Sequence, residues 1–298
     1  MTGEFRAALL QGGLHFDTGV DGLYIRSETF ENVVRAIDGL VSATGSDQQA
    51  TVLHFPPIIP RVVFEHSGYL RSFPDLLGSI DVFDGNEALH AELIERLEQG
   101  ENWAELLTAS DLTLCSAGCH PLYPLCSGRL REGGRRFEVF GHCFRHEPSL
   151  DPARMQSFRQ HEFVYVGDPA DAVAHRDLWL ERSAELLSGL GLAVEKVVAN
   201  DPFFGRGGKM LASNQRAEEL KYEVVCAIQP DIEPTALSSS NYHLDHFGAE
   251  FGIEAASGKP AHSACVGFGV ERITLALLAT HGLDPQEWPD HVHERLWP

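Results

Sequence analysis

Positive charge is scarce in this sequence. Its 298 residues hold 23 lysines and arginines against 43 aspartates and glutamates, a formal net charge of -20 at pH 7. Only four of the basic residues are lysines (Lys196, Lys209, Lys221 and Lys259). A surface of this kind repels nucleic-acid backbones and anionic membranes at long range. We therefore expect no broad RNA or DNA binding and no membrane association, and any phosphate site must be local and built from a few arginines.

Long apolar runs and an export signal are also missing. No apolar stretch approaches the ~20 residues that span a bilayer, and Met1–Gly12 lacks the basic and apolar segments of a signal peptide. The expected location is therefore the cytoplasm, where cysteines stay reduced. No paired Cys-x-x-Cys array is present, so a closed structural zinc site is not indicated. The six cysteines are Cys115, Cys119, Cys126, Cys143, Cys226 and Cys265.

Repeats and low-complexity tracts are absent as well, which excludes solenoids and linker-rich arrays. The predicted strands do not alternate regularly with helices, so we expect an α+β fold, an antiparallel sheet flanked by helices. Residues 1–298 are predicted to form a single domain, with an N-terminal appendage (1–49), a core (50–298) and a polar tail after the last helix. Periodicity predicts helices at 28–44, 87–98, 170–190 and 270–280, and strands at 50–55, 111–117, 136–145, 162–166, 193–199, 221–228 and 236–242.

The most informative segment combines arginine, carboxylates and an aromatic residue. Arg145 and Glu147 share a face of one predicted strand, and Phe158 and Glu162 lie on a second strand after the Pro148–Pro152 turn. Such a hairpin presents these side chains to one cleft. Arginine binds phosphate through paired hydrogen bonds, and an aromatic ring stacks on a purine. A surface hairpin with an Arg–Glu ion pair explains these residues equally well.

A glycine pair opens the last predicted helix in Gly267-Phe268-Gly269-Val270-Glu271-Arg272. Alone it is a common helix entry, because it lacks the third glycine and the strand–helix setting of a dinucleotide fingerprint. Together with Phe144-Arg145-His146-Glu147 and Arg154-x3-Phe158-x3-Glu162, however, it resembles motifs 2 and 3 of the class II aminoacyl-tRNA synthetases. His54–Ile59 and Ser67–Phe73 are similar to the motif 1 region of seryl-tRNA synthetases.

This resemblance implies an antiparallel sheet that carries a bent ATP with Mg²⁺. Arg145 would hold the α-phosphate and the attacked carboxylate, and Glu147 would contact the amino edge of adenine. Phe158 and Arg272 would sandwich the adenine ring. Arg145 and Arg272 are thus implied as catalytic residues, and the further ATP-binding residues are Arg154, Lys221, Glu223, Ala236, Leu237, Ser238 and Ser239.

Three further segments narrow the resemblance to the zinc-dependent, methanogen-type seryl-tRNA synthetases and their small relatives, the amino acid:[carrier protein] ligases. These segments are Ala117–Pro124, His161–Phe163 and Ser263–Gly267. The resemblance implies that Cys119, Glu162 and Cys265 hold one Zn²⁺ per subunit. The open fourth position would bind the free amino group of the substrate, with Glu162 and Asn241 contacting the amino acid. The spacing of Cys115 and Cys119 alone is compatible both with a pair of metal ligands and with packing in the core.

The similarity covers residues 50–280, including the glycine-rich segment Gly205–Lys209. It implies a homodimeric ligase that activates a small amino acid, glycine or alanine, as aminoacyl-AMP. The aminoacyl group would pass to the phosphopantetheine thiol of a carrier protein. Motif 1 near residue 50 leaves no room for a preceding tRNA-binding domain, and the charge of -20 also disfavours tRNA.

Two alternatives are an enzyme of the same core that loads tRNA and a non-catalytic paralogue that only binds amino acid. The presence of Arg145, Phe158 and Arg272 argues against the second. A basic cluster at 127–131 and 135–136 is either a docking patch for the carrier or a solvated hairpin tip.

Overall fold

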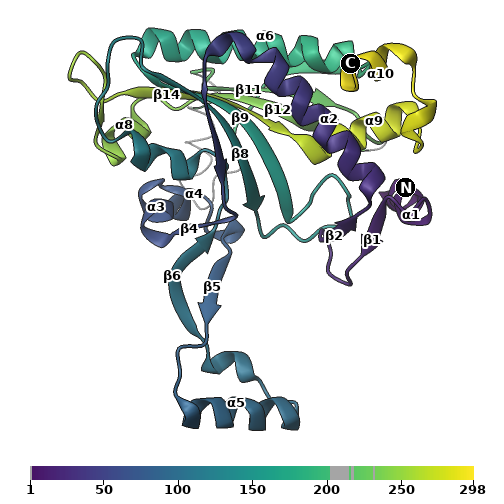
Figure 1. Ribbon diagram of the computed structural model, residues 1–298, viewed down its shortest axis with the longest axis vertical. Helices are drawn as coiled ribbons and strands as arrows, with labels where there is room; N and C mark the ends of the chain where they lie inside the picture. Colours follow the sequence, from purple (N-terminus) through teal and green to yellow (C-terminus); the bar gives the residue numbers. More distant parts are fainter. Residues whose placement is uncertain (1, 202–214, 216–217, 231) are drawn as a thin grey trace.

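A seven-stranded sheet forms the centre of the protein in the computed structural model, which describes residues 2–201, 215, 218–230 and 232–298 (Figure 1). All neighbouring strands are antiparallel except β3 and β8, which run parallel. The prediction of an α+β fold with a helix-flanked antiparallel sheet is confirmed. In spatial order the strands are β10 (Val194–Val198), β11 (Lys221–Cys226), β12 (Thr235–Tyr242), β14 (His262–Gly269), β9 (Ser157–Gly167), β8 (Arg135–Phe144) and β3 (Thr51–Phe55).

Helices α2 (Glu28–Thr44), α6 (Pro169–Gly189) and α9 (Val270–His281) pack in one apolar core against this sheet. The apolar residues of α2 repeat at helical spacing and are buried, and the Ser27 hydroxyl caps the helix by accepting from the N–H of Phe30 at 3.2 Å. In α6, Trp179 stacks on Phe163 of β9 with ring centres 4.2 Å apart. The odd-numbered side chains of β9 thus face the helices.

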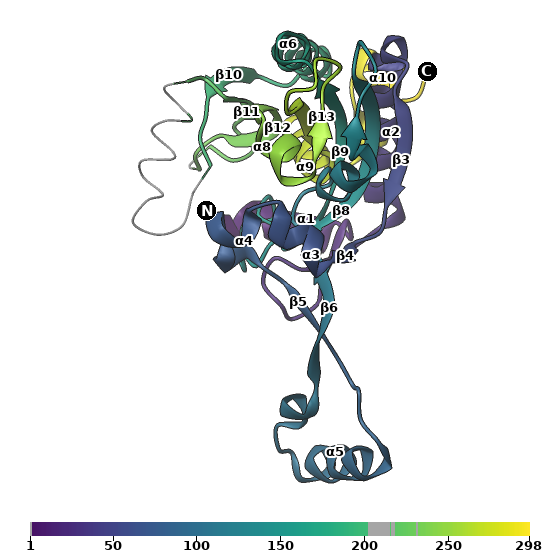
Figure 2. The same ribbon diagram turned by 90° about the vertical axis from the view of Figure 1, so that its left-hand side faces the viewer.

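Smaller elements surround the sheet. The helix α5 (Glu87–Gln99) lies at the far end of an arm formed by two strands, and it buries none of its side chains against the described residues (Figure 2). The other small elements are α1 (Thr2–Gln11), β1 (His15–Asp17), β2 (Tyr24–Arg26), β4 (Ile58–Pro60), α3 (Arg61–His66), α4 (Tyr69–Ser72), β5 (Ser79–Val82), β6 (Thr108–Leu114), β7 (Gly128–Arg129), α8 (His246–Glu250), β13 (Ile253–Glu254) and α10 (Asp290–Leu296).

The predicted helices are confirmed to within one residue at each end, whereas several strand predictions need correction. The strand predicted at 162–166 begins at Ser157, the strand predicted at 111–117 ends at Leu114, and β14 was not predicted as a strand. Arg145 and Glu147 do not alternate on a strand, because β8 ends at Phe144. The N–H of Arg145 still bonds the carbonyl of Gln156 at 2.9 Å, after which Pro148 lacks the N–H that would extend the ladder.

The two ends of the sequence contribute to the core. The predicted polar tail is wrong: Trp288, Val292 and Leu296 are buried in the same core as α9, so the segment is amphipathic. Residues 1–49 supply α2 to this core, and their description as an appendage to a single domain stays a prediction. Among the described residues, no helix combines the length and the apolar character needed to cross a bilayer.

Candidate functional site

A cavity of about 640 Å³ lies on the sheet face opposite α2 and α6, lined by β9, β11, β12, β14 and the start of α9. It gathers segments that are far apart in the sequence. Every site residue predicted above lines this cavity except Arg154, whose side chain is exposed. The lining includes Cys119, Arg145, Glu147, Phe158, Glu162, Lys221, Glu223, Ala236, Leu237, Ser238, Ser239, Asn241, Cys265 and Arg272.

Arg145 is fixed in this cavity by the loop that follows β8. Its Nε donates to the carbonyl of Ser116 at 3.2 Å, and its guanidinium carbon lies 5.4 Å from the centre of the Phe158 ring. Burial works against the charge, but Tyr69 and the nearby acidic groups raise the pKa of Arg145 above its ordinary value. The loop therefore presents a permanent cation beside an aromatic face.

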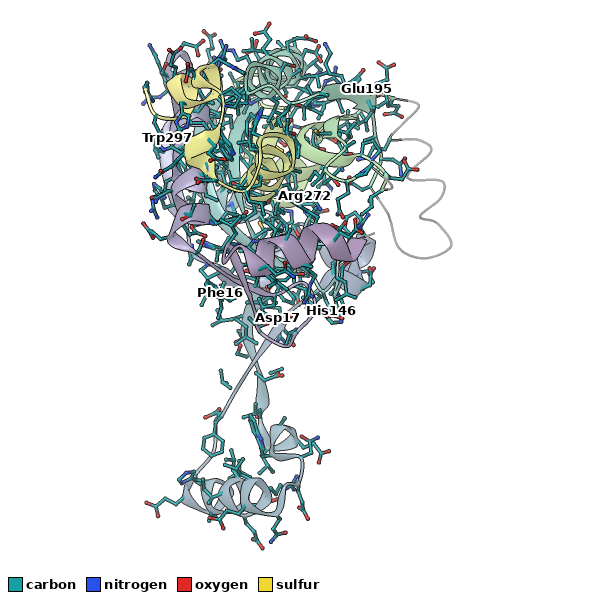
Figure 3. The ribbon with its side chains drawn as sticks, turned by 90° about the vertical axis from the view of Figure 1, so that its right-hand side faces the viewer. Phe16, Asp17, His146, Glu195, Arg272 and Trp297 are labelled. Atoms are coloured by element: carbon teal, nitrogen blue, oxygen red, sulfur yellow. The ribbon has the colours of Figure 1, made fainter. Side chains whose placement is uncertain are left out.

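Arg272 lies in the first turn of α9 and is held by two backbone carbonyls. Its Nε donates to Ala153 at 2.9 Å and one terminal nitrogen to Ala236 at 3.3 Å. Burial, followed by the charges of Arg145 and Arg154, lowers the pKa of Arg272, but a guanidinium stays charged. Arg272 is half-buried, whereas Phe16 and Trp297 are exposed; all three are labelled in Figure 3.

Lys221 and two carboxylates form an ion-pair group at another wall of the cavity. The Nζ of Lys221 lies 2.5 Å from Asp201 Oδ1 and 3.1 Å from Glu223 Oε1. Gln215 donates to the other oxygen of Asp201 at 2.8 Å. Burial opposes ionisation of Asp201, but Lys221 and Gln215 hold its pKa below the ordinary value. Lys221 and Glu223 share a face because they are two residues apart on β11.

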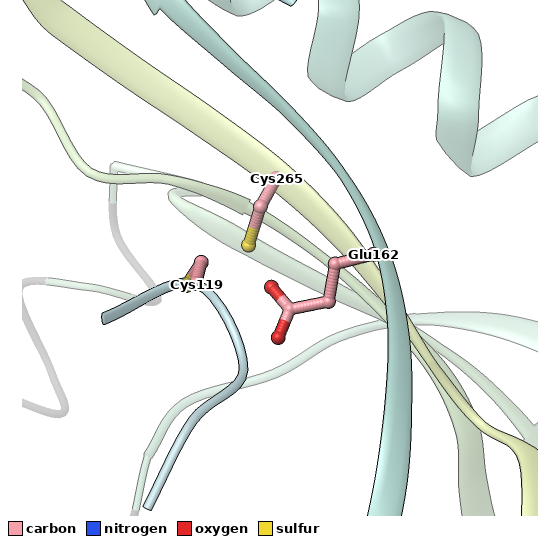
Figure 4. A group of neighbouring side chains, drawn as sticks. All are labelled: Cys119, Glu162 and Cys265. Atoms are coloured by element: carbon pink, nitrogen blue, oxygen red, sulfur yellow. The ribbon is translucent and has the colours of Figure 1, made fainter. Parts of the chain in front are cut away.

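Cys119, Glu162 and Cys265 form a compact, buried group at one end of the cavity (Figure 4). One ligand atom from each lies within 4.8 Å of the others. In the β9–β14 register Glu162 faces Gly267, whose missing side chain leaves room beside the carboxylate. A Cβ on Gly118 would lie 2.8 Å from Glu162 Oε1, so a larger residue next to Cys119 would displace this carboxylate.

The donor set fits a bound zinc ion. Glu162 Oε1 is buried and has no hydrogen-bond partner among the described residues, a costly arrangement unless something else binds it. Burial raises the pKa of Glu162 well above its ordinary value, with the charge of Cys265 adding to the effect. A dication would remove this cost, and two thiols with a carboxylate are ligands that zinc accepts.

Asn241 was predicted at this site, whereas its neighbours His243 and Gln160 were not. Asn241 Nδ2 and His243 Nε2 each lie 3.6 Å from Cys265 Sγ, and His243 Nδ1 lies 2.9 Å from Ser263 Oγ. Gln160 accepts from the N–H of Gly118 at 2.9 Å and so ties the Cys119 loop to β9. Strand alternation places Gln160 on the face of Glu162 and was a usable signal; no spacing pointed to His243.

The other cysteine and arginine candidates have different surroundings. Cys115 is buried with Ile59 and Phe64, which supports packing rather than a metal pair with Cys119. In the basic cluster, Arg129 bonds the carbonyl of Ala256 at 2.6 Å, and Arg135 lies over the ring of Phe137. The glycine-rich segment 205–209 lies outside the described residues.

Comparison with known proteins identifies the family. No protein-family model matches the chain. It is 40% identical over 285 residues to amino acid--[acyl-carrier-protein] ligase 1 of Bradyrhizobium diazoefficiens, covering 95% of this chain and 87% of that protein. Ligase 2 of the same organism is 41% identical over 289 residues, covering 96% and 86%. The chain belongs to the amino acid–[acyl-carrier-protein] ligase family.

This ligase is also similar to longer proteins. The type-2 serine--tRNA ligase of Methanopyrus kandleri is 26% identical over 265 residues, covering 81% of this chain and 50% of that protein. The solved M. kandleri seryl-tRNA synthetase, in complex with tRNASec from A. aeolicus, superposes with a TM-score of 0.83 at 22% identity, covering 99% and 60%. Seryl-tRNA synthetase from Pyrococcus horikoshii, complexed with ATP, gives 0.70 at 14% identity, covering 98% and 62%.

These neighbours confirm the class II synthetase fold, and the ligase spans about half the length of the curated serine--tRNA ligase. The predicted family resemblance is likewise confirmed, because the two Bradyrhizobium proteins align along almost all of the chain.

Proposed function

We propose that this protein uses ATP to activate a small α-amino acid, glycine or alanine, and transfers the aminoacyl group to the phosphopantetheine thiol of a carrier protein. The observation that carries the proposal is one cavity with two chemically different ends. Phe158 lies toward one end, with the guanidinium of Arg145 5.4 Å from its ring, and Cys119, Glu162 and Cys265 form the other end; Arg272 also lines the cavity. Two relatives at 40% and 41% identity are named amino acid--[acyl-carrier-protein] ligases.

In the first step, the substrate carboxylate attacks the α-phosphorus of ATP, the bond to pyrophosphate breaks, and aminoacyl-AMP forms. Negative charge builds up at phosphorus, so fixed cations lower the barrier more than a protein nucleophile would. Arg145 would bind the α-phosphate and the attacking carboxylate, while Mg²⁺ accompanies the pyrophosphate. Adenine would lie between Phe158 and Arg272, with its amino edge toward Glu147. Arg154, Lys221, Glu223 and residues 236–239 would line the rest of the ATP site.

In the second step, the carrier thiolate attacks the carbonyl carbon of aminoacyl-AMP and AMP leaves, so no covalent enzyme intermediate is required. Cys119, Glu162 and Cys265 would hold one zinc ion per subunit. When bound, the ion would offer an open coordination position to the substrate amino group, which excludes molecules without one. Glu162 and Asn241 would orient the amino acid. His120 and Phe247 also line the cavity, and these rings favour a small side chain.

The decisive experiment is a pyrophosphate-exchange screen across the amino acids, followed by loading assays on holo-carrier protein and on tRNA. We expect ATP-dependent exchange with glycine or alanine and a thioester on the carrier that hydroxylamine cleaves. The apo-carrier, which lacks the thiol, is the matched control. Absence of exchange with every amino acid would refute the activity, and loading of tRNA but not of holo-carrier would refute the proposed acceptor.

Replacing Arg145 tests the role of the central cation. Arg145→Ala should lower kcat/KM for exchange by about 10²-fold or more, because the fixed positive charge proposed to bind the α-phosphate would be lost. Arg35→Ala is the control, since Arg35 pairs with Glu28 on the exposed face of α2. The metal content of both variants should equal that of the parent. An Arg145→Ala enzyme with full activity contradicts the assignment.

Metal analysis tests the other end of the cavity. Cys265→Ala should lose the bound zinc, whereas Cys226→Ala, which alters a cysteine buried elsewhere in the core, should retain it. Zinc added to the metal-free parent should stabilise it by about 2.7 kcal/mol at one hundred times the dissociation constant. Mass spectrometry of the metal content and thermal unfolding provide the two readouts. Equal zinc binding by the parent and Cys265→Ala would exclude these ligands.

We further propose that the protein is a homodimer that pairs through the motif 1 region. The strand β3 is an edge of the main sheet, and Val52, Ile58 and Val62 nearby are exposed apolar side chains. Val62→Glu would place a charge in that interface and should shift the molecular mass in light scattering toward one chain. Leu178→Glu, at an exposed position of α6, should leave the mass unchanged. A monomeric parent protein would disprove the dimer.

A further inference from the structure

Four charged side chains beside the cavity, of which Glu271 also lines it, join the N-terminal segment to the proposed adenine site. They come from four elements: Arg26 from β2, Glu31 from α2, Arg159 from β9 and Glu271 from the first turn of α9. We call this group the brace. Two of its members adjoin the proposed adenine contacts in sequence, since Arg159 follows Phe158 and Glu271 precedes Arg272.

Glu271 is the centre of the brace. Its Oε1 accepts from the Nε of Arg159 at 2.7 Å, and its Oε2 accepts from the backbone N–H of Arg159 at 2.9 Å. A single carboxylate therefore ties the start of α9 to both the side chain and the main chain of β9. The side chain of Glu271 is 0% exposed, so its charge depends on these partners.

The N-terminal segment completes the brace. The two terminal nitrogens of Arg159 donate to the two oxygens of Glu31 at 2.7 and 2.9 Å, a bidentate pair. Arg26 approaches Glu271 Oε1 at 3.4 Å and donates to the carbonyl of Ser157 at 2.9 Å. Two positive and two negative side chains balance. Every nitrogen of the Arg159 guanidinium has a carboxylate partner, whereas the buried Nε of Arg26 has none among the described residues. The bonds of Arg159 to Glu31 and Glu271 therefore carry most of the connection between the elements.

The Arg159 side chain does not line the cavity, but strand alternation places it next to a side chain that does. Phe158 lines the cavity, whereas Arg159 points to the opposite face of β9, toward α2. Shifting Arg159 would move the backbone that carries Phe158, and shifting Glu271 would move the turn that carries Arg272. The separation of the two adenine contacts therefore depends on the brace.

We propose that Glu31 and Arg26 are positioning residues for ATP, through which the N-terminal segment sets the spacing between Phe158 and Arg272. This inference rests on the proposed function in one respect, namely that adenine binds between those two side chains. The metal-binding residues have no contact with Glu31 in the described structure, so zinc content and the amino-acid site should be independent of it.

The test compares Glu31→Gln with Glu28→Gln, which lies on the same helix and alters a 78% exposed carboxylate paired with Arg35. Glutamine keeps the size of glutamate but removes the charge from the bidentate pair. We expect Glu31→Gln to raise the KM for ATP in exchange, and the Kd for ATP in calorimetry, by about tenfold. The KM for the amino acid and the zinc content should stay at parent values, and Glu31→Asp should recover part of the ATP affinity.

The outcomes separate the brace from the proposed function. Equal ATP affinity in the Glu31→Gln and Glu28→Gln variants would overturn the positioning role. A parallel loss of ATP affinity, amino-acid affinity and melting temperature would also overturn it, because Glu31 would then be a general structural residue. If the parent protein shows no exchange, the proposed function fails, while calorimetry with ATP still supports or overturns the brace.

Discussion

The side-chain alternation of β9 is the constraint on which the rest of the structure depends. Phe158, Gln160 and Glu162 face the cavity, whereas Arg159, His161 and Phe163 face the helices. A shift of one residue in register would exchange the two sets and bury the wrong ones. Both faces fix the register. Gln160 holds the Cys119 loop on one side, and on the other side α2 contacts β9 through the Glu31–Arg159 ion pair and the Asp38–His161 hydrogen bond.

The arginines on the two faces of the sheet also differ in how their charge is balanced. The chain carries a net charge of -20, yet Arg145 and Arg272 line the cavity as half-buried side chains that are held by backbone carbonyls. Carbonyl contacts position a guanidinium without neutralising it, so these cations remain available to an anionic substrate. On the opposite face, Arg159 is neutralised by two carboxylates. The described lining of the cavity also contains several carboxylates, so attraction of phosphate depends on the local positions of these two arginines and not on a net positive charge of the cavity.

The sequence predicted the helices and the class of fold well, because periodicity records which faces are buried. Strand alternation also predicted that Phe158 and Glu162 share one face of the same strand. Arg145 and Glu147 were misplaced on a strand because their position depends on the prolines and the turn that follow β8. The grouping of Cys119 with Cys265 came from family resemblance, since spacing says nothing about cysteines joined only by the sheet. The brace was not predicted at all, because Glu31 is an ordinary polar residue at its place in an amphipathic helix.

The strand β9 also sets the distances between the side chains proposed to bind the two substrates. Phe158 and Glu162 are four residues apart on the same face, which separates their Cα atoms by roughly 13 Å at the rise of a β-strand. Arg145 is anchored to Ser116, on the loop that carries Cys119, and its guanidinium lies 5.4 Å from the Phe158 ring. In the proposed reaction, the adenine end, the reacting phosphorus and the amino end would therefore be held at fixed separations by β9 and one loop. Rigid spacing of this kind favours catalysis by orientation, since the two reactants meet without a further entropy cost.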